Sequence, residues 1–149
     1  MARKVFFSFH YQRDLWRVNV VRNSGLVEGI SAAGFHDASL WEETIKKGEV
    51  AIKQLIDNGL VGTSVTVVLI GAETANRKYV SYEIEKSIER GNGIFGIRIN
   101  NLKDRDGRIE QPGAVPVALS RIGAPVYNYE YGKLGEWVEE AHKTADSTC

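Results

Sequence analysis

The chain has a single cysteine, Cys149, among 149 residues. One cysteine cannot form an internal disulfide or a cysteine metal cluster, which excludes disulfide-stapled secreted domains and leads us to expect an intracellular, cytoplasmic protein. An excess of charge of one sign is also missing, because 19 basic side chains balance 19 acidic ones. This balance leaves no electrostatic footprint for nucleic acid or for an anionic membrane surface.

Long hydrophobic runs are absent as well. No apolar run approaches the roughly 18–20 residues that span a bilayer, and the run after Met1 is too short for a signal peptide. Hydrophobic residues make up 43% of the chain and charged residues 26%, as in ordinary soluble globular proteins. We therefore expect no membrane association and a single domain over residues 1–149.

Several catalytic signatures are also missing. No G-x-G-x-x-G directly follows the first predicted strand, and the sequence has no G-x-x-x-x-G-K-[ST], no G-x-S-x-G and no H-E-x-x-H. These absences argue against a Rossmann dinucleotide site, a P-loop and a hydrolase nucleophile elbow, and no metal site is predicted. A phosphoaspartyl switch is disfavoured too, since Ser8 and Gly71, rather than aspartates, stand at the ends of the first and third predicted strands.

What the chain does contain is an alternation of strand and helix patterns. Predicted strands cover residues 5–9, 35–37, 63–70, 94–99 and 126–129. Predicted helices cover residues 13–27, 49–58, a segment carrying Glu83 that ends near Gly91, and residues 132–146. Residues 100–113 form a long polar loop. The alternation predicts an α/β protein with a flavodoxin-like, five-stranded parallel sheet and helices on both faces.

Ligands of such a sheet bind at the carboxyl ends of its strands. The segments that leave the first three predicted strands are residues 8–11, 37–41 and 71–74, and we expect them to line one crevice with the Glu83 helix. Their side chains are aromatic and polar around one strong acid, which suits a nucleoside better than a bare phosphate. His10 is either a ligand or an exposed loop histidine, and Trp41 either stacks on a base or plugs the edge of the core.

Glu83 is the candidate acid. Helical periodicity points Val80 and Ile84 at the core and places Tyr79, Glu83 and Ser87 on a neighbouring stripe. The stripe sets a carboxylate beside an aromatic ring just after a strand that is predicted to be buried. The alternative is that Glu83 is a solvated helix glutamate, as charged helix residues usually are.

Two segments resemble Toll/interleukin-1 receptor (TIR) and TIR-like domains. Residues 4–10 (KVFFSFH), with Asp14 shortly after, resemble the opening strand and first loop of that family. Residues 76–84 (NRKYVSYEI) resemble the helix that carries its NAD-cleaving glutamate, which an aromatic residue, often tryptophan, precedes by four positions. Here that residue is Tyr79. Residues 4–138 are most similar to the stand-alone TIR-like (ThsB) proteins of the Thoeris anti-phage system.

The resemblance implies a fold of five parallel strands and an activity on NAD, which is the substrate rather than a cofactor. It implies that Glu83 is catalytic in breaking the nicotinamide–ribose bond and that the product is a cyclic ADP-ribose isomer. The implied partners are a separate effector protein that receives this diffusible nucleotide, and further a second copy of the chain or a phage-derived trigger. The substrate-binding residues expected around Glu83 are Phe6 or Phe7, Ser8, Phe9, His10 and Tyr79, with Asp37 and Trp41 opposite.

Two other functions stay open at the level of the sequence. The first is a TIR-like interaction module that assembles with other TIR domains and catalyses nothing. The second is a nucleoside deoxyribosyltransferase-like enzyme, which shares the α/β layout and a ribose-contacting glutamate.

Overall fold

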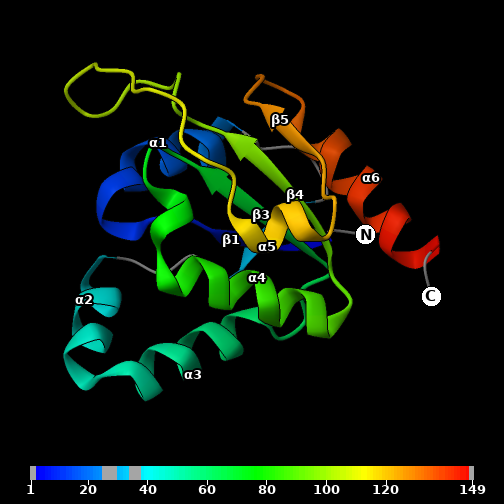
Figure 1. Ribbon diagram of the computed structural model, residues 1–149, viewed down its shortest axis with the longest axis horizontal. Helices are drawn as coiled ribbons and strands as arrows, with labels where there is room; N and C mark the ends of the chain where they lie inside the picture. Colours follow the sequence, from blue (N-terminus) through cyan, green and yellow to red (C-terminus); the bar gives the residue numbers. More distant parts are fainter. Residues whose placement is uncertain (1–2, 25–29, 34–37, 148–149) are drawn as a thin grey trace.

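The computed structural model describes residues 3–24, 30–33 and 38–147 and shows a parallel sheet flanked by helices (Figure 1). Within these residues the sheet has five strands in the order β2-β1-β3-β4-β5, and every neighbouring pair is parallel. The strands are β1 (Arg3–Ser8), β2 (Ile30–Ala33), β3 (Val65–Ile70), β4 (Gly93–Arg98) and β5 (Val126–Asn128). The expected α/β class, a parallel sheet with flanking helices, is confirmed.

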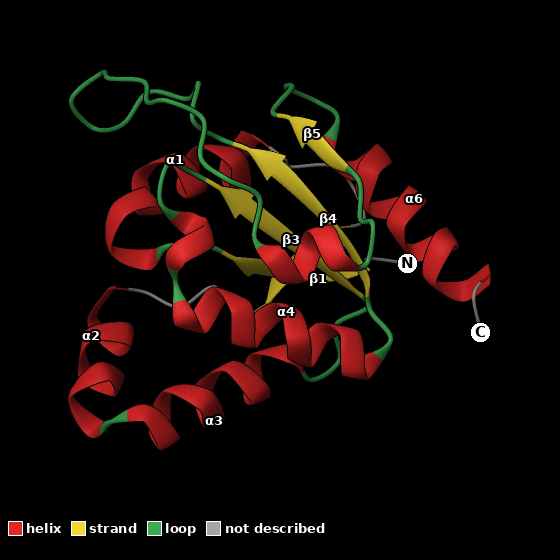
Figure 2. Ribbon diagram, viewed as in Figure 1, coloured by secondary structure: helices red, strands yellow, loops and turns green. Residues whose placement is uncertain are grey.

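Helices connect the strands and cover both faces of the sheet (Figure 2). They are α1 (Tyr11–Ser24), α2 (Ala38–Lys47), α3 (Glu49–Leu60), α4 (Lys78–Arg90), α5 (Val117–Arg121) and α6 (Leu134–Ser147), with a 3₁₀ turn, η1 (Thr74–Asn76), before α4. None of the helices in the described part of the chain is long and apolar enough to cross a membrane.

Strand β1 shows how the sheet divides the core into two layers. Phe7 packs with Val18 of α1 in the layer that also holds α6. Phe6 packs with Ile52 of α3 in the opposite layer, next to α4. Successive side chains of a strand point to opposite faces, so Ser8 shares the face of Phe6. This alternation decides which residues of β1 can reach the helix that carries Glu83.

The two elements that carry the strongest sequence signals fall close to their predicted places. Every residue of β3 (Val65–Ile70) is buried, as expected of a parallel strand covered on both faces. Helix α4 ends at Gly91, whose φ of 80° is the left-handed conformation that glycine adopts most easily at a helix end. The helix is therefore held between a buried strand and a defined stop.

The connecting segments differ from expectation in three places. The structure has strand β2 at Ile30–Ala33, whereas the residues predicted as the second strand, 35–37, lie outside the described residues. Residues 38–41, expected in a loop, begin helix α2. The short helix α5 was not predicted at all. The Ile-Ser-Ala-Ala segment of β2 has a weak β-strand signal, and its hydrogen-bonded pairing with β1 makes it a strand.

The long loop after β4 is tied to α1 by a buried arginine. Arg17 is 1% exposed. Its guanidinium donates to the carbonyl of Leu102 at 2.7 Å, the carbonyl of Arg108 at 2.9 Å and the carboxylate of Glu110 at 3.0 Å. Asp14, one helical turn earlier, lies 3.5 Å from the same guanidinium. The loop is thus anchored from three points by one side chain of α1.

Candidate active site

The strand order places a ligand crevice at the carboxyl ends of β1 and β3. These two strands are neighbours at the centre of the sheet, but the helices that follow them, α1 and α4, cover opposite faces. Such a reversal leaves a gap between the outgoing connections, where parallel sheets bind their ligands. Ser8 ends β1 at this point, and Glu83 lies on α4 above it.

Helix α4 turns Glu83 toward the sheet because its buried stripe runs alongside that residue. Val80, Ile84 and Ser87 are 2%, 0% and 0% exposed, and Glu83 itself is 8% exposed. The hydroxyl of Ser8 donates a hydrogen bond of 2.6 Å to Oε1 of Glu83. Glu83 is therefore no solvated helix glutamate: its carboxyl group is buried and joined to the end of β1.

Burial changes the acidity of this carboxyl group. Loss of water around Glu83 raises its pKa to about 8, and the hydrogen bond from Ser8 acts in the opposite direction. Desolvation dominates because it penalises the charged form of a carboxyl group. A carboxyl group with this pKa is mostly protonated at neutral pH, and a positive charge brought next to it would favour the carboxylate.

Glu83 opens into a pocket of about 290 Å³. Its walls come from the β1–α1 connection, the α2–α3 corner and the first half of α4. The lining residues are Phe9, His10, Ile45, Gly48, Glu49, Ile52, Arg77, Tyr79, Val80 and Glu83. A pocket that combines apolar and aromatic side chains with polar groups and a buried acid of raised pKa is typical of a ligand site.

The structure brings four of the residues named from the sequence to this pocket: Phe9, His10, Tyr79 and Glu83. Ser8 lies behind the carboxyl group and holds it. The prediction that a side chain from residues 8–10 lies within about 10 Å of the Glu83 carboxylate, roughly two strand spacings, is confirmed by the 2.6 Å hydrogen bond from Ser8. The substrate-binding roles of these residues stay predictions.

The two phenylalanines of β1 do not line the pocket. Phe7 is 2% exposed and lies in the core layer of α1 and α6, on the face of the sheet away from Glu83, so its expected place at the site was wrong. Phe6 is on the correct face but is buried under Ile52, and Tyr79 packs on the same cluster. Phe6 therefore supports the pocket wall from below instead of forming its surface.

The residues expected opposite β1 are only partly placed. Asp37 lies outside the described residues, and Trp41 is in α2 with a side chain that is also outside the described set. From α2 it is Ile45 that lines the pocket. The turn after β3 was wrongly expected in the lining: the amide of Gly71 donates to Thr74 Oγ1 at 2.8 Å, and a Cβ at Gly71 would collide with the Asp14 carboxylate.

The sequence analysis missed the charged residues at the rim. Glu49, the first residue of α3, forms ion pairs through its Oε1 with Nζ of Lys53 at 3.1 Å and with Nζ of Lys78 at 2.8 Å. Arg77 stands immediately before α4 and also lines the pocket. The sequence could have indicated Arg77, because it lies two positions before Tyr79 within residues 76–84. Helical periodicity, however, does not distinguish an arginine at the rim of a pocket from one that is fully solvated.

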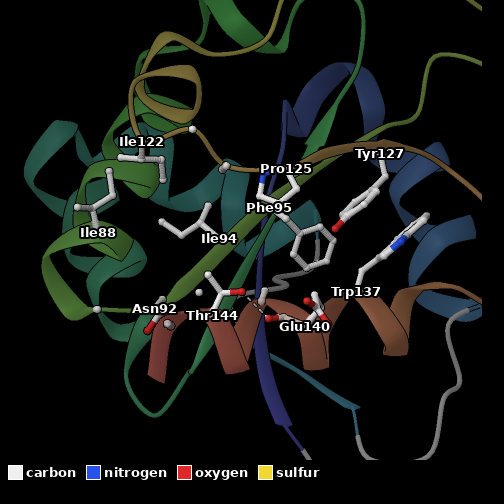
Figure 3. Close-up of a pocket in the computed structure, with 16 residues that line it drawn as sticks. Ile88, Asn92, Ile94, Phe95, Ile122, Pro125, Tyr127, Trp137, Glu140 and Thr144 are labelled. Carbon is white, nitrogen blue, oxygen red and sulfur yellow. Dashed lines mark hydrogen bonds between the residues drawn. The ribbon is translucent and has the colours of Figure 1, made fainter. Parts of the chain in front are cut away.

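A second, larger pocket lies elsewhere, around the start of β4 (Figure 3). It has about 330 Å³ and includes Phe95, Tyr127 and Trp137 in its wall. The rings of Tyr127 and Trp137 stack at 4.5 Å between centroids. Its one carboxylate, on Glu140, is exposed, so this pocket lacks the buried acid that marks the Glu83 site.

Metal ligation has no visible basis in the described part of the chain. Residues 3–24, 30–33 and 38–147 contain no group of three or more histidine, cysteine, aspartate or glutamate side chains that could hold a metal ion. What the Glu83 pocket offers is one buried acid, Glu83, near the aromatic side chains of Phe9 and Tyr79. That arrangement can stabilise a positive charge that develops on a bound molecule.

Two comparisons with known proteins bear on this site. Residues 6–104 match the family model described as "Thoeris protein ThsB, TIR-like domain". The chain is also 50% identical, over 146 residues, to a protein of Bacillus cereus (strain MSX-D12) named "Putative cyclic ADP-D-ribose synthase ThsB1". The matched region covers 93% of this chain and 76% of that relative. The family match includes the last three residues of β1 and the whole of α4, and hence both Ser8 and Glu83.

Proposed function

The chain belongs to the TIR-like family of the Thoeris protein ThsB, and from this premise we propose that it is an NAD-processing enzyme. In this proposal it breaks the bond between nicotinamide and ribose and joins the ADP-ribose to itself, which gives a cyclic ADP-ribose isomer. The observation that carries the proposal is the buried carboxyl group of Glu83, held by Ser8 in a pocket walled by Phe9 and Tyr79. The name of the 50% identical relative, a cyclic ADP-ribose synthase, supports the same product class.

Glu83 acts on the charge that appears when the glycosidic bond breaks. The bonding electron pair leaves with nicotinamide, whose ring changes from a cation to a neutral molecule, and the ribose becomes oxocarbenium-like. A carboxylate beside the ribose stabilises that cation more strongly than it stabilises the bound substrate, which is the condition for faster chemistry. Glu83 acts as a carboxylate only after it ionises, since burial raises its pKa to about 8 and keeps it mostly protonated at neutral pH.

Binding of NAD supplies the reason for Glu83 to ionise. The nicotinamide ring of the substrate is positively charged, and an opposite charge within about 4–6 Å lowers the pKa of a carboxyl group. The substrate therefore produces the catalytic form of the acid on arrival. In the absence of substrate the pocket is not left with a buried, unpaired negative charge, which would be costly.

The aromatic and aliphatic walls bear on the choice of product. If a hydroxyl group of the ADP-ribose portion attacks the cation, a carbon–oxygen bond closes the ring and the hydroxyl proton is released. If water attacks, the product is linear ADP-ribose. Phe9, Tyr79 and Ile45 line the pocket and limit its water content, which favours ring closure.

The first experiment is to incubate the protein with NAD and identify the products by mass spectrometry. Glu83→Gln keeps the shape of the side chain but removes its ionisation, and we expect at least a 100- to 1,000-fold loss of turnover, about 2.7–4 kcal/mol, as for removal of one oxyanion-hole donor. The matched control is Glu89→Gln on the same helix, whose side chain is 66% exposed and which should turn over NAD normally. Turnover by Glu83→Gln at the wild-type rate would remove Glu83 from the mechanism.

We further propose that the product acts in cytoplasmic anti-phage defence, after a phage-derived trigger, by activating a separate effector protein. The test is to filter small molecules from phage-infected cells that carry the chain and to add them to a purified candidate effector. Activation by the filtrate supports a diffusible signal. An inactive filtrate, together with activation by direct contact of the two proteins, would instead support a non-catalytic interaction module.

A further inference from the structure

The pocket of Glu83 has opposite charges at its two ends. Glu83 lies in the interior, 8% exposed, whereas Arg77 lies at the exposed rim where α4 begins. Both belong to one stretch of chain, and Val80 between them lines the same pocket. Arg77 is the N-cap of α4, with an extended backbone, and Val80 and Glu83 follow it on the side of the helix that lines the pocket.

Arg77 is the rim cation that remains available to a ligand. Among the described residues, no side-chain hydrogen bond or ion pair engages its guanidinium. The other charged groups nearby are already occupied, because Glu49 is paired with both Lys53 and Lys78. The rim therefore presents one unneutralised arginine above a pocket whose only buried acid is Glu83.

The two groups suit a ligand with charges of both signs. Arg77 at the rim and Glu83 in the interior line the same pocket of about 290 Å³, so one bound molecule can meet both. Arginine binds phosphate oxygens through a planar fork of donors, often two at a time. A buried carboxylate at the other end prefers a cation.

We propose that Arg77 binds the diphosphate of the substrate and thereby holds the nucleotide in the pocket of Glu83. This inference rests on the proposed function, since NAD carries a cationic nicotinamide ribose next to a diphosphate in this order. It also specifies the substrate class: the site selects nucleotides with a diphosphate over phosphate-free nucleosides. Arg77 is thus a binding residue whose contribution separates an NAD-processing enzyme from a nucleoside-processing one.

The experiment compares the wild type with Arg77→Gln, Arg77→Lys and Arg90→Gln. Arg90 is the matched control, because it is an exposed arginine at the far end of the same helix and outside the Glu83 pocket. Two quantities are measured for each protein: kcat and KM for NAD, and Kd for ADP-ribose by titration calorimetry. The second does not depend on turnover, and thermal unfolding of each variant confirms that it is folded.

For Arg77→Gln we expect KM and the Kd for ADP-ribose to rise about 10- to 100-fold, as for loss of a hydrogen-bonded charge contact. The kcat should stay the same, because the contact is present equally in substrate and transition state. Arg77→Lys should recover part of the loss by keeping the charge without the fork. Arg90→Gln should match the wild type in both quantities.

The outcomes separate this inference from the proposed function. If the wild type cleaves NAD and Arg77→Gln has the same KM and Kd as Arg90→Gln, the role of Arg77 is wrong and the enzyme remains. If the wild type binds ADP-ribose through Arg77 but leaves NAD intact, the diphosphate site stands and the enzymatic proposal fails. If the wild type does not bind ADP-ribose, the diphosphate site is wrong whatever the turnover shows.

Discussion

Replacing Glu83 by glutamine should stabilise the protein, and by an amount that depends on pH. The pKa of Glu83 is raised from 4.5 to about 8 by burial. Between these two values the folded state holds a proton that the unfolded state has released, so the free energy of unfolding of the wild type falls as pH rises. At about 1.36 kcal/mol per pKa unit, the loss accumulates to about 5 kcal/mol by pH 8.

Glutamine cannot ionise, so Glu83→Gln should be spared this loss. Its amide oxygen still accepts the hydrogen bond of Ser8, which the wild-type carboxyl group receives at 2.6 Å. Below about pH 4.5 Glu83 is protonated in both the folded and the unfolded state, so the two proteins should differ least at the acid end of the range. Near pH 8 the variant should be more stable by several kcal/mol, with about 5 as the upper limit.

Urea unfolding at about pH 5, 6, 7 and 8 measures this difference, provided that the slope with denaturant is equal in both proteins. Every other titrating group is shared and cancels in the comparison. Glu89→Gln is the control, since its exposed side chain should leave the pH dependence of the wild type unchanged. Parallel stability curves for wild type and Glu83→Gln across this range would show that Glu83 ionises normally in the fold and would refute the reasoning.

Two further predictions follow from the same contacts. The kcat/KM for NAD should rise with pH and level off above about 8, because Glu83 must lose its proton between the free enzyme and the reactive complex. Ser8→Ala removes the hydrogen bond that lowers this pKa and should move the midpoint to higher pH. An unshifted midpoint would contradict the role of Ser8. Arg17→Met should lower the free energy of unfolding by about 3–5 kcal/mol in urea titrations, because it removes the cation that the carboxylates of Asp14 and Glu110 share. A loss below about 1 kcal/mol, which is typical of surface ion pairs, would show that Arg17 does not anchor the loop.

Local patterns determined most of what was predicted correctly. A continuous apolar run marks β3 because a strand covered on both faces needs apolar side chains at every position. The helical period placed Val80 and Ile84 in the core and Glu83 beside them. The same local signal was too weak for β2, where partner strand β1 decides the conformation of a segment with few β-branched residues.

The strand order is the main feature that required the tertiary structure for the site. It brings Ser8 to Glu83 although the two are 75 residues apart in the sequence. The tertiary structure also decides that Phe7 lies on the face away from Glu83. Alternation along β1 separates Phe6 from Phe7 but does not say which helices cover each face. Ile45 and Glu49, at the α2–α3 corner, line the pocket only because the tertiary structure packs this corner next to α4 and the end of β1.

The sequence by itself determined the fold class, the helix that carries Glu83 and the acid on its inward stripe, because these depend on periodicities within a single element. Only the tertiary structure decided that Glu83 is buried and has a raised pKa, since desolvation depends on all the elements packed around it. The same holds for Arg17 and Arg77: the first is buried by a loop about 85–93 residues further along the chain, and the second stays exposed at a pocket rim. The sequence alone does not distinguish a buried arginine from an exposed one, because burial depends on residues that are distant in the chain.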